Sequence, residues 1–220
     1  QNTRSYEFGL DLRFLNNRIG VDYSYYMQNT EDQIFGVPMA GSAGYSTFVT
    51  NAGKMSTYGH EIVLSATPVK KANFTWDFAV NFTKAVSKVE ELAPGVESIS
   101  LGGYVTPNIR ASAGDTYPAI YGDMYARDDK GRILVDDQGL PYAGEFGKIG
   151  DVSPDFILGF SNTFNLFKYV TVFGQLEWKQ GGQIYSGTNR LMDLYGTSKR
   201  TEDRVTPFIF DGYKEDGTPN

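Results

Sequence analysis

The sequence predicts an all-β fold built from antiparallel hairpins, and three observations favour it. Apolar side chains recur at every second position through three pairs of segments, which is the periodicity of strands with one apolar face. Aromatic residues make up 15% of the 220 residues and there are 25 glycines, a composition typical of strands and turns. No apolar run approaches the roughly 18 residues of a membrane-spanning helix, so we exclude a helical membrane protein.

The first pair of strands is predicted on either side of the turn Asn16-Asn17. If Phe14 pairs with Ile19 across this turn, the apolar rows of both strands fall on one face of the hairpin. The polar residues then share the other face. The two rows are Tyr6, Phe8, Leu10, Leu12 and Phe14, followed by Ile19, Val21, Tyr23, Tyr25 and Met27.

The second pair is predicted over residues 58–67 and 74–83, with residues 68–73 as the turn and Ala66 paired with Phe74. One row of its second strand contains no polar member, and the opposite row is small or polar, as expected for a wall between lipid and a wet interior. The residues that we predict to face lipid are Phe74, Trp76, Phe78, Val80 and Phe82.

The third pair follows the same plan around a turn at residues 165–168, and long segments separate the pairs. These segments are residues 28–57, 84–154 and everything after Lys179; within 84–154 we expect a small hairpin that turns at Lys130-Gly131. Short turns at one end and long loops at the other are typical of an outer-membrane barrel. Six strands are too few to enclose a wide lumen, so we expect the chain to be part of a larger transmembrane β-barrel.

The alternation alone also fits other classes of protein. In a soluble secreted β-sandwich, such as a carbohydrate-binding module, the apolar rows would pack sheet on sheet. In a secreted β-rich hydrolase, the aspartate pairs would be catalytic. The formal charge of −6 argues against a nucleic-acid partner, and the absence of cysteine excludes disulfides and thiolate chemistry.

His60 is the single histidine, and we interpret it as a wall residue near an interface. The other candidate polar residues fall into two groups. The first group is a set of carboxylates of the kind that stabilises turns, and Asp128 and Asp136 are candidate calcium ligands. The set has neither the ligand spacing nor the closing glutamate of a calcium loop. We therefore predict no cofactor and no catalytic role for it. Its members are Asp128, Asp129, Asp136 and Asp137.

The second group lies in the aromatic part of the segment 84–154, where tyrosines alternate with Gly, Pro and Asp. Flat rings beside carboxylates and an arginine suit sugars or peptides, because they combine apolar area with hydrogen-bonding groups. The alternative is that these rings only pack the segment against its neighbours. The candidate contact residues are Tyr117, Tyr121, Asp123, Tyr125 and Arg127, and the same segment also carries Tyr104 and Tyr142.

Several separate blocks, in the same order along the chain, resemble the C-terminal barrel region of SusC/RagA-type TonB-dependent transporters. The resemblance covers most of residues 3–190. The blocks are SYEFGLDLRFLNNRIGVDYSYY, DQIFGVPMAGSAGYSTFVTNAGKMSTYGHEIVLSATPV, FTWDFAVNFTKAVSKVEEL, IYGDMYARDDKGRILVDDQGLP, GDVSPDFILGFSNTF and KQGGQIYSGT.

This resemblance implies a barrel of about 22 strands around a plug, in the outer membrane of a Gram-negative bacterium. It implies import of oligosaccharides or oligopeptides, driven through TonB, together with a SusD/RagB-like surface lipoprotein that closes over the barrel. Residues 1–220 would all belong to the barrel domain, with residues 84–154 as a long extracellular loop. We expect the plug, the TonB-contacting segment and the terminal aromatic strand to lie outside this sequence.

Overall fold

The computed structural model describes residues 1–167 and 169–220, without the side chains of Pro38 and Ala52. It confirms the all-β prediction, because strands dominate and the single α-helix among these residues, α1 (Gly187–Leu194), is short. Within the described part of the chain, no helix is long and apolar enough to cross a membrane. The strands are β1 (Asn2–Phe14), β2 (Ile19–Pro38), β3 (Thr47–Lys71), β4 (Phe74–Leu92), β5 (Ser98–Gly103), β6 (Asn108–Ser112), β7 (Ala119–Tyr125), β8 (Ala143–Asp151), β9 (Pro154–Leu166) and β10 (Val170–Gly181).

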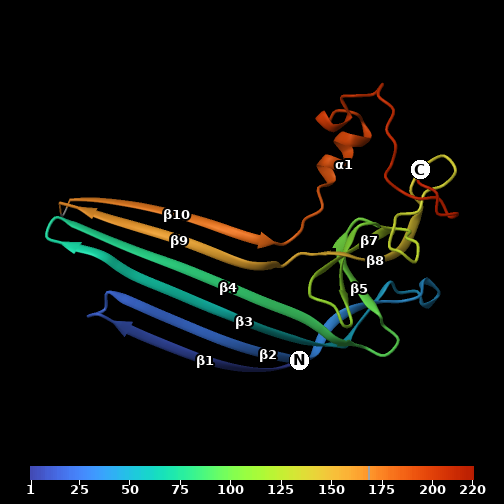
Figure 1. Ribbon diagram of the computed structural model, residues 1–220. Coiled ribbons are helices and arrows are strands. Elements are labelled where there is room, and N and C mark those ends of the chain that lie inside the picture. Colours follow the sequence, from blue (N-terminus) through green and yellow to red (C-terminus); the bar gives the residue numbers. More distant parts are fainter. Residues whose placement is uncertain (168) are drawn as a thin grey trace. The chain divides into compact units, whose positions relative to one another are not determined.

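The chain divides into two compact units. The sheet unit comprises Gln1–Leu101, Arg110–Ala119 and Asp151–Gln183, and the loop unit comprises Gly102–Ile109, Ile120–Gly150 and Ile184–Asn220. The sheet unit contains a six-stranded antiparallel sheet in the order β1-β2-β3-β4-β9-β10. This sheet is open, with β1 and β10 at its edges, and its three short turns lie at the same end (left in Figure 1).

The register of β1 and β2 is the predicted one, with Phe14 opposite Ile19 and Phe8 opposite Tyr25. The turn has left-handed backbone at Asn16 and Asn17, with φ values of 56° and 63°. Asparagine tolerates this conformation better than most residues, which explains why the alternation pauses there. The amide of Arg18 closes the turn by donating to the carbonyl of Phe14 at 3.0 Å.

The predicted register of β3 and β4 is wrong, although the predicted face is right. Ala66 lies opposite Phe78 and not opposite Phe74, because β3 continues to Lys71 and leaves a two-residue turn. Between Ala66 and Val69 the register shifts at a β-bulge. The bulge contains Pro68, a residue that sheets accept at such irregularities because its missing N–H breaks no ladder bond there. The extra residue keeps Val69 on the same face as Ala66.

Strand β9 pairs with β4 on one side and with β10 on the other. Val172 lies opposite Phe164 and Trp178 opposite Leu158, so the predicted apolar rows of this pair align. The predicted turn, residues 165–168, begins too early, since β9 runs through Leu166; Lys168 lies outside the described residues. Pairing of β9 with β4 brings together strands separated by the whole segment 93–153.

The strands are longer than their apolar rows predicted. β2 continues to Pro38, β3 already begins at Thr47, and β4 runs on to Leu92, through residues that we expected to be loops. These extensions contain mostly polar side chains, so they lack the alternation from which the strands were recognised. Their backbone pairing, such as Val37 with Phe48, defines them instead.

The segment between β4 and β9 forms a second, four-stranded sheet in the order β5-β6-β7-β8. Residues 112–117 return along the end of β4: the amide of Val89 donates to the carbonyl of Asp115 and the amide of Tyr117 to that of Ser87, at 2.9 and 2.8 Å. The buried apolar side chains of the described residues belong to this part of the chain or, in the case of Val89, to the end of β4 along which it returns. They are Val89, Ile99, Ala111, Ala119, Ile120 and Val135.

Candidate functional site

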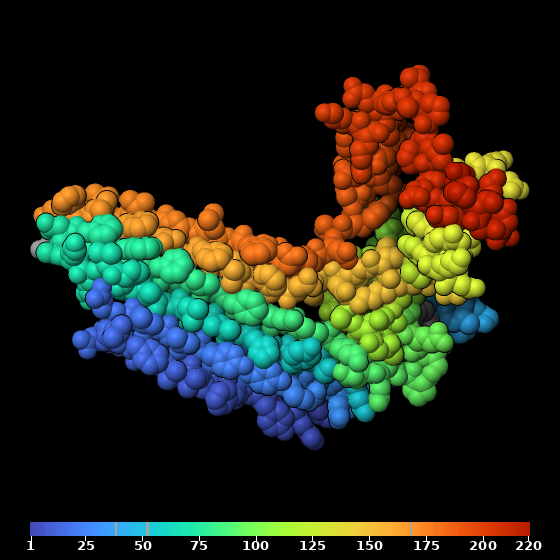
Figure 2. All heavy atoms as spheres, in the orientation of Figure 1, coloured from blue at the N-terminus to red at the C-terminus, as the bar shows by residue number. Residues whose placement is uncertain are grey.

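One face of the six-stranded sheet carries an apolar row on every strand. At the level of Val80, apolar residues lie opposite one another on all six strands. The same holds two residues further along β4, at the level of Phe82. The strands lie side by side in the space-filling view, from blue β1 to orange β10 (Figure 2). The residues at these two levels are Leu12, Val21, Leu64, Val80, Phe160 and Leu176, and Leu10, Tyr23, Ile62, Phe82, Leu158 and Trp178.

Aromatic rings join neighbouring strands across this face. The ring centroids of Trp76 and Phe164 lie 5.9 Å apart and those of Phe82 and Phe156 lie 5.8 Å apart. Such separations are typical of attractive ring pairs. All five residues predicted to face lipid, from Phe74 to Phe82, lie on this face and are half-buried between their neighbours. We call it the apolar face.

Asn162 interrupts the apolar face, and the sequence pattern gave no role to it. The residue lies opposite Phe78 on the neighbouring strand. Its side-chain oxygen accepts a hydrogen bond of 3.0 Å from the indole Nε1 of Trp76. Two polar groups on an otherwise apolar surface thereby satisfy each other. A tryptophan on the adjacent strand was the available signal, since a buried indole N–H needs an acceptor.

His60 lies on the apolar face of β3, two residues before Ile62 and therefore one level beyond that of Phe82. Its Nδ1 is 3.0 Å from the hydroxyl of Tyr23, and its ring centroid is 5.0 Å from that of Tyr25. Directly opposite on β4 is Lys84. The prediction of His60 as a wall residue beside a change of environment stays a prediction, but its neighbours are aromatic and cationic and include no second metal-ligand type.

The opposite face of the sheet is polar and has little bulk. Arg13 binds Asp22 through two hydrogen bonds of 3.1 and 3.0 Å, and a further ion pair of 2.8 Å links it to Asp11. The arginine lies over Gly20, where an added Cβ would be 2.8 Å from its Nη1. Small residues continue the same level across the sheet, with Ser65 opposite Ala79. We call this the polar face.

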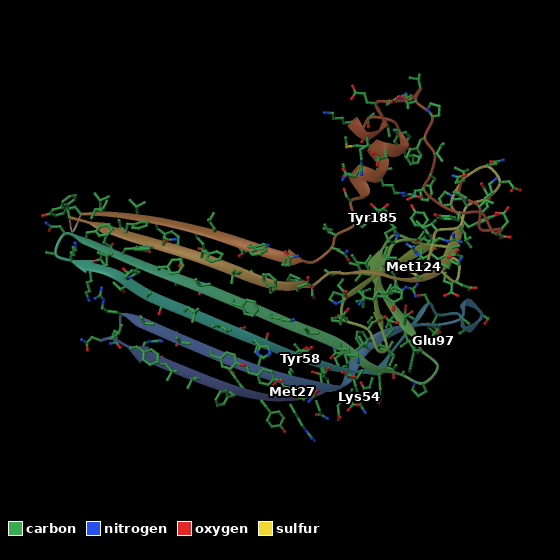
Figure 3. All side chains as sticks on the ribbon, viewed as in Figure 1. Met27, Lys54, Tyr58, Glu97, Met124 and Tyr185 are labelled. Carbon is green, nitrogen blue, oxygen red and sulfur yellow. The ribbon has the colours of Figure 1, made fainter. Side chains whose placement is uncertain are left out.

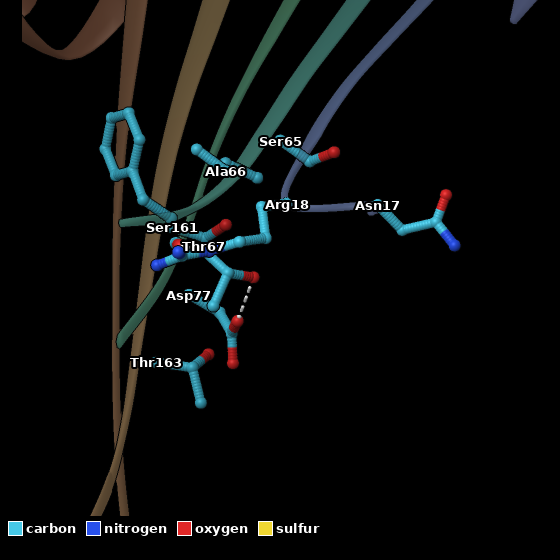
Figure 4. A pocket seen from close by; sticks show the side chains of 10 residues that line it. Asn17, Arg18, Ser65, Ala66, Thr67, Asp77, Ser161 and Thr163 are labelled. Atoms are coloured by element: carbon cyan, nitrogen blue, oxygen red, sulfur yellow. Dashed lines mark hydrogen bonds between the residues drawn. The ribbon is translucent and has the colours of Figure 1, made fainter. Parts of the chain in front are cut away.

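A shallow hollow of about 220 Å³ opens near the short turns (Figure 4). The bulge of β3 forms part of its wall, and two residues hold that bulge in place. Arg18 donates to the carbonyls of Thr67 and Pro68 at 3.2 and 3.0 Å. Thr67 donates through its hydroxyl to Asp77 at 2.7 Å, the dashed bond in Figure 4. The hollow therefore presents fixed hydrogen-bonding groups rather than an enclosed cavity.

Four of the five candidate contact residues belong to the loop unit. Tyr121, Asp123 and Tyr125 alternate along β7, so they share one face of that strand. Tyr121 lies with its ring 6.1 Å from that of Phe146, and Tyr125 lies 5.6 Å from Phe210. Tyr125 is nevertheless 51% exposed and Asp123 is exposed. Tyr125 thus packs on one side and leaves the rest of its ring exposed, next to the exposed Asp123.

Arg127 and Tyr117 differ from this group in their surroundings. Arg127 is exposed and donates through Nη1 to the carbonyl of Gly131 at 2.6 Å, across a reversal of the chain. Tyr117 belongs to the sheet unit, where it lines a hollow of about 160 Å³ with Lys84, Thr116 and Asp155 among others. Whether these five residues contact a ligand stays a prediction.

The two candidate calcium ligands stabilise turns. Asp128 accepts hydrogen bonds from the amides of Lys130 and Arg132, both at 2.9 Å, and pairs with the guanidinium of Arg132 at 2.7 Å. The amide of Arg132, followed by its guanidinium, lowers the pKa of Asp128 below its ordinary value. Asp136 makes the same two amide bonds in the turn 136–140. Over the described residues, no three His, Asp or Glu side chains gather closely enough to hold a metal ion.

The C-terminal residues of the loop unit attach to the same turns, which sequence reasoning missed. Tyr213 exchanges backbone hydrogen bonds with Ile133 and Val135, at 2.8 and 2.9 Å. The guanidinium of Arg132 lies over the ring of Tyr213, 3.9 Å from its centroid. The available signal was the sequence DDKG, DDQG and EDGT, three similar turn motifs that lie next to these bonded residues along the chain.

Comparison with known proteins identifies the family to which these features correspond. The family described as TonB dependent receptor-like, beta-barrel matches residues 1–213. TonB-dependent receptor P3 of Formosa agariphila is 24% identical over 267 residues, which covers 96% of this chain and 26% of the relative. The TonB-dependent receptor SusC of Bacteroides thetaiotaomicron is 30% identical over 99 residues, covering 44% of this chain and 10% of the relative.

Solved structures share the fold. The RagAB peptide transporter superposes with a TM-score of 0.66 at 20% identity, covering 81% of this chain and 21% of that chain. The RagAB peptide importer in its closed-closed state gives a TM-score of 0.64 at 22% identity, covering 82% and 21%. The chain therefore spans about a quarter or less of the proteins that it matches. These matches confirm the resemblance that the sequence blocks indicated.

Proposed function

The chain belongs to the family of TonB-dependent receptor-like β-barrels, and on that premise we propose that it forms part of the wall of an outer-membrane transporter in a Gram-negative bacterium. The transporter takes up oligosaccharides or oligopeptides by active, TonB-dependent import. It acts together with a SusD/RagB-like surface lipoprotein, and it contacts TonB through a segment outside this sequence.

The apolar face is the observation that carries this proposal. Among the described residues its side chains are partly covered by neighbours on adjacent strands, and Tyr6 and Phe8 on the edge strand are 66% and 60% exposed. In a β-sandwich the same rows would be buried against a second sheet. A continuous apolar surface of this size on six strands needs a partner, and the hydrocarbon of a bilayer is the partner that also explains the polar face behind it.

The dimensions of the apolar face suit a bilayer. The row from Phe74 to Phe82 spans eight residue steps, which at about 3.4 Å per residue is about 27 Å along the strand. Strands in outer-membrane barrels tilt by about 35–45°, so the row covers roughly 19–22 Å of membrane thickness. This agrees with an apolar band of about 25 Å once the side chains at its ends are included.

Two observations support oligosaccharides or oligopeptides as the cargo. The structures that share the fold are described as a peptide transporter and importer, and a relative is SusC. On this chain, the half-buried Tyr121 and the exposed Tyr125 flank Asp123 on one strand face. Rings with adjacent carboxylates bind polar organic molecules through stacking and hydrogen bonds. We place these residues at the extracellular mouth, where they contact the cargo or the lipoprotein.

A hydrolase has less support from the same residues. The carboxylates of Asp128 and Asp136 are occupied by turn amides, so neither is poised as an acid or a nucleophile. We assign no catalytic residue in this chain. Calcium at these turns would require Asp128 to give up its bonds to Arg132, and we regard both aspartates as structural.

The test is uptake by cells that produce the full-length protein. Fluorescent oligosaccharide and oligopeptide mixtures are offered to parent cells, to cells without the transporter gene, and to cells in which TonB is inactive. We expect one class of cargo to accumulate only when both the transporter and TonB are present, and the surface lipoprotein to copurify with the barrel. Equal accumulation of both classes in all three strains would overturn the proposal.

A further inference from the structure

We propose that Lys84, His60 and Tyr25 form a binding site for the phosphate of a lipid headgroup, on the outside of the barrel wall. The inference rests on the proposed function, because it assumes that the apolar face meets the bilayer. It adds to that function a recognition site for an anionic lipid, at the end of the apolar face nearest the long connections.

The position of Lys84 is the first support. It is the next residue after Phe82 on the same face of β4, so it stands where the uninterrupted row from Phe74 ends. Its direct partner on β3 is His60, whose own partner on β2 is Tyr25. Directly opposed residues in a sheet have Cβ atoms about 4.5–5.5 Å apart. Three polar tips therefore follow one another along a single level of the sheet.

The contacts of His60 allow a tautomer in which it offers a donor at Nε2. The Tyr23 hydroxyl lies 3.0 Å from Nδ1, and the ring lies against Tyr25. With this hydroxyl as the donor, the proton of a neutral imidazole is on Nε2. The histidine then presents an N–H next to the ammonium of Lys84 and the hydroxyl of Tyr25. Donors of this kind select an anion.

The charges around Lys84 are the third support. Across the described residues it makes no ion pair, whereas Lys54 and Lys88 pair with Glu91 and Glu90 at 3.3 and 3.8 Å. Glu61, the neighbour of its partner His60, belongs to the polar face, and Asp155, which lines the same hollow as Lys84, forms no ion pair with it among the described residues. An ammonium that is not bound in an ion pair, at the edge of an apolar surface, is complementary to a phosphate.

A lipid headgroup suits the site better than a free anion. The site continues the apolar face without a gap, so acyl chains beside Phe82 and Ile62 would bring their phosphate to its level. One level further, Met27 and Tyr58 lie on adjacent strands and extend the aromatic and apolar boundary (Figure 3). Lysine and tyrosine at such a boundary keep their apolar parts in the membrane and their polar tips at the headgroups.

The test measures lipid binding to the full-length barrel, purified in detergent and stripped of lipid. Native mass spectrometry compares phosphatidylglycerol, diacylglycerol with the same acyl chains, and inorganic phosphate alone. The variants are Lys84→Gln and His60→Gln, and the control is Lys179→Gln, which removes a lysine from the polar face of β10 near the same end of the sheet. Resistance of the folded barrel to heating in detergent shows that each variant is assembled.

We expect Lys84→Gln to weaken phosphatidylglycerol binding about fivefold, because a lysine near an anionic headgroup contributes on this scale. His60→Gln should weaken it in the same direction, and Lys179→Gln and diacylglycerol binding should not change. Equal effects of the two lysine variants, or none from Lys84→Gln, would overturn the site. Phosphate alone bound as tightly as the lipid would overturn the headgroup assignment. A chain that stayed monomeric in buffer and took up no lipid would instead overturn the proposed function.

Discussion

Adjacent residues in the middle of β4 should respond in opposite ways to the same substitution. Phe78 is the third of five members of the apolar row, lies opposite Ala66 and Asn162, and has its ring 6.3 Å from that of Trp76. Ala79, the next residue, lies on the polar face opposite Ser65. Phe78→Arg therefore puts a guanidinium into the bilayer at mid-depth, and Ala79→Arg puts it into the wet interior.

The difference in free energy follows from these positions. An arginine on the lipid face of an outer-membrane barrel costs about 2–4 kcal/mol at the midplane. This corresponds to a roughly 30- to 700-fold shift in the equilibrium between assembled and unassembled barrel. At Ala79 the new side chain has Asp77 two residues away on the same face, so a favourable ion pair is within reach. We expect its effect to stay within about 0.5 kcal/mol.

Assembly of the full-length variants is measured in two ways. The heat-modifiable fraction on gels reports folded barrel in outer-membrane preparations, and urea titration in lipid vesicles gives the free energy of unfolding. A conservative variant, Phe78→Leu, separates the charge from the loss of the ring. Equal loss of assembly from Phe78→Arg and Ala79→Arg would refute the assignment of faces, and greater loss from Ala79→Arg would reverse it.

Three further predictions concern the two ends of the barrel. An epitope tag inserted after Gly131 should bind antibody on intact cells and one after Lys71 should not; the reverse pattern would invert the barrel. Tyr121→Ala and Arg127→Ala should each weaken cargo or lipoprotein binding by about 1 kcal/mol or more while the melting temperature of the barrel is unchanged, and unchanged binding would remove both residues from the contact surface. Because its folded-state pKa lies below the ordinary 3.8, Asp128 stabilises its turn above that pH and loses this effect as the pH falls through the lowered value. The protection of the two amides bound to its carboxylate, measured as the hydrogen-exchange rate relative to that of an unstructured peptide at the same pH, should therefore fall below about pH 4 and stay constant from pH 5 to 8.

The hairpin β1–β2 could be predicted to the residue because its information is local. Alternation set the two faces, and the pause at Asn16-Asn17 marked the turn that aligned them. The register of β3 and β4 was not predicted correctly, since a bulge leaves no trace in a pattern of apolar and polar letters. Strand alternation also missed Asn162, whose place on the apolar face depends on a tryptophan 86 residues earlier in the chain.

The loop unit was the least predictable part. Its polar sequence shows no period, and its order depends on contacts between distant turns, such as Tyr213 with Ile133 and Val135. The candidate residues along β7 were chosen by composition, which indicated their chemistry but not that Tyr121 and Tyr125 would share a face. That sharing follows only from the strand that the structure forms there.

The bulge in β3 has a consequence for how such a wall changes during evolution. In an uninterrupted strand, insertion or deletion of a single residue moves every following side chain to the opposite face of the sheet. Selection therefore removes such length variants. At Pro68 the chain already holds one surplus residue, and a deletion would restore plain alternation with Val69 still beside Ala66. Homologous walls of different length are therefore expected to differ by single residues at this position, and elsewhere in the strands by pairs.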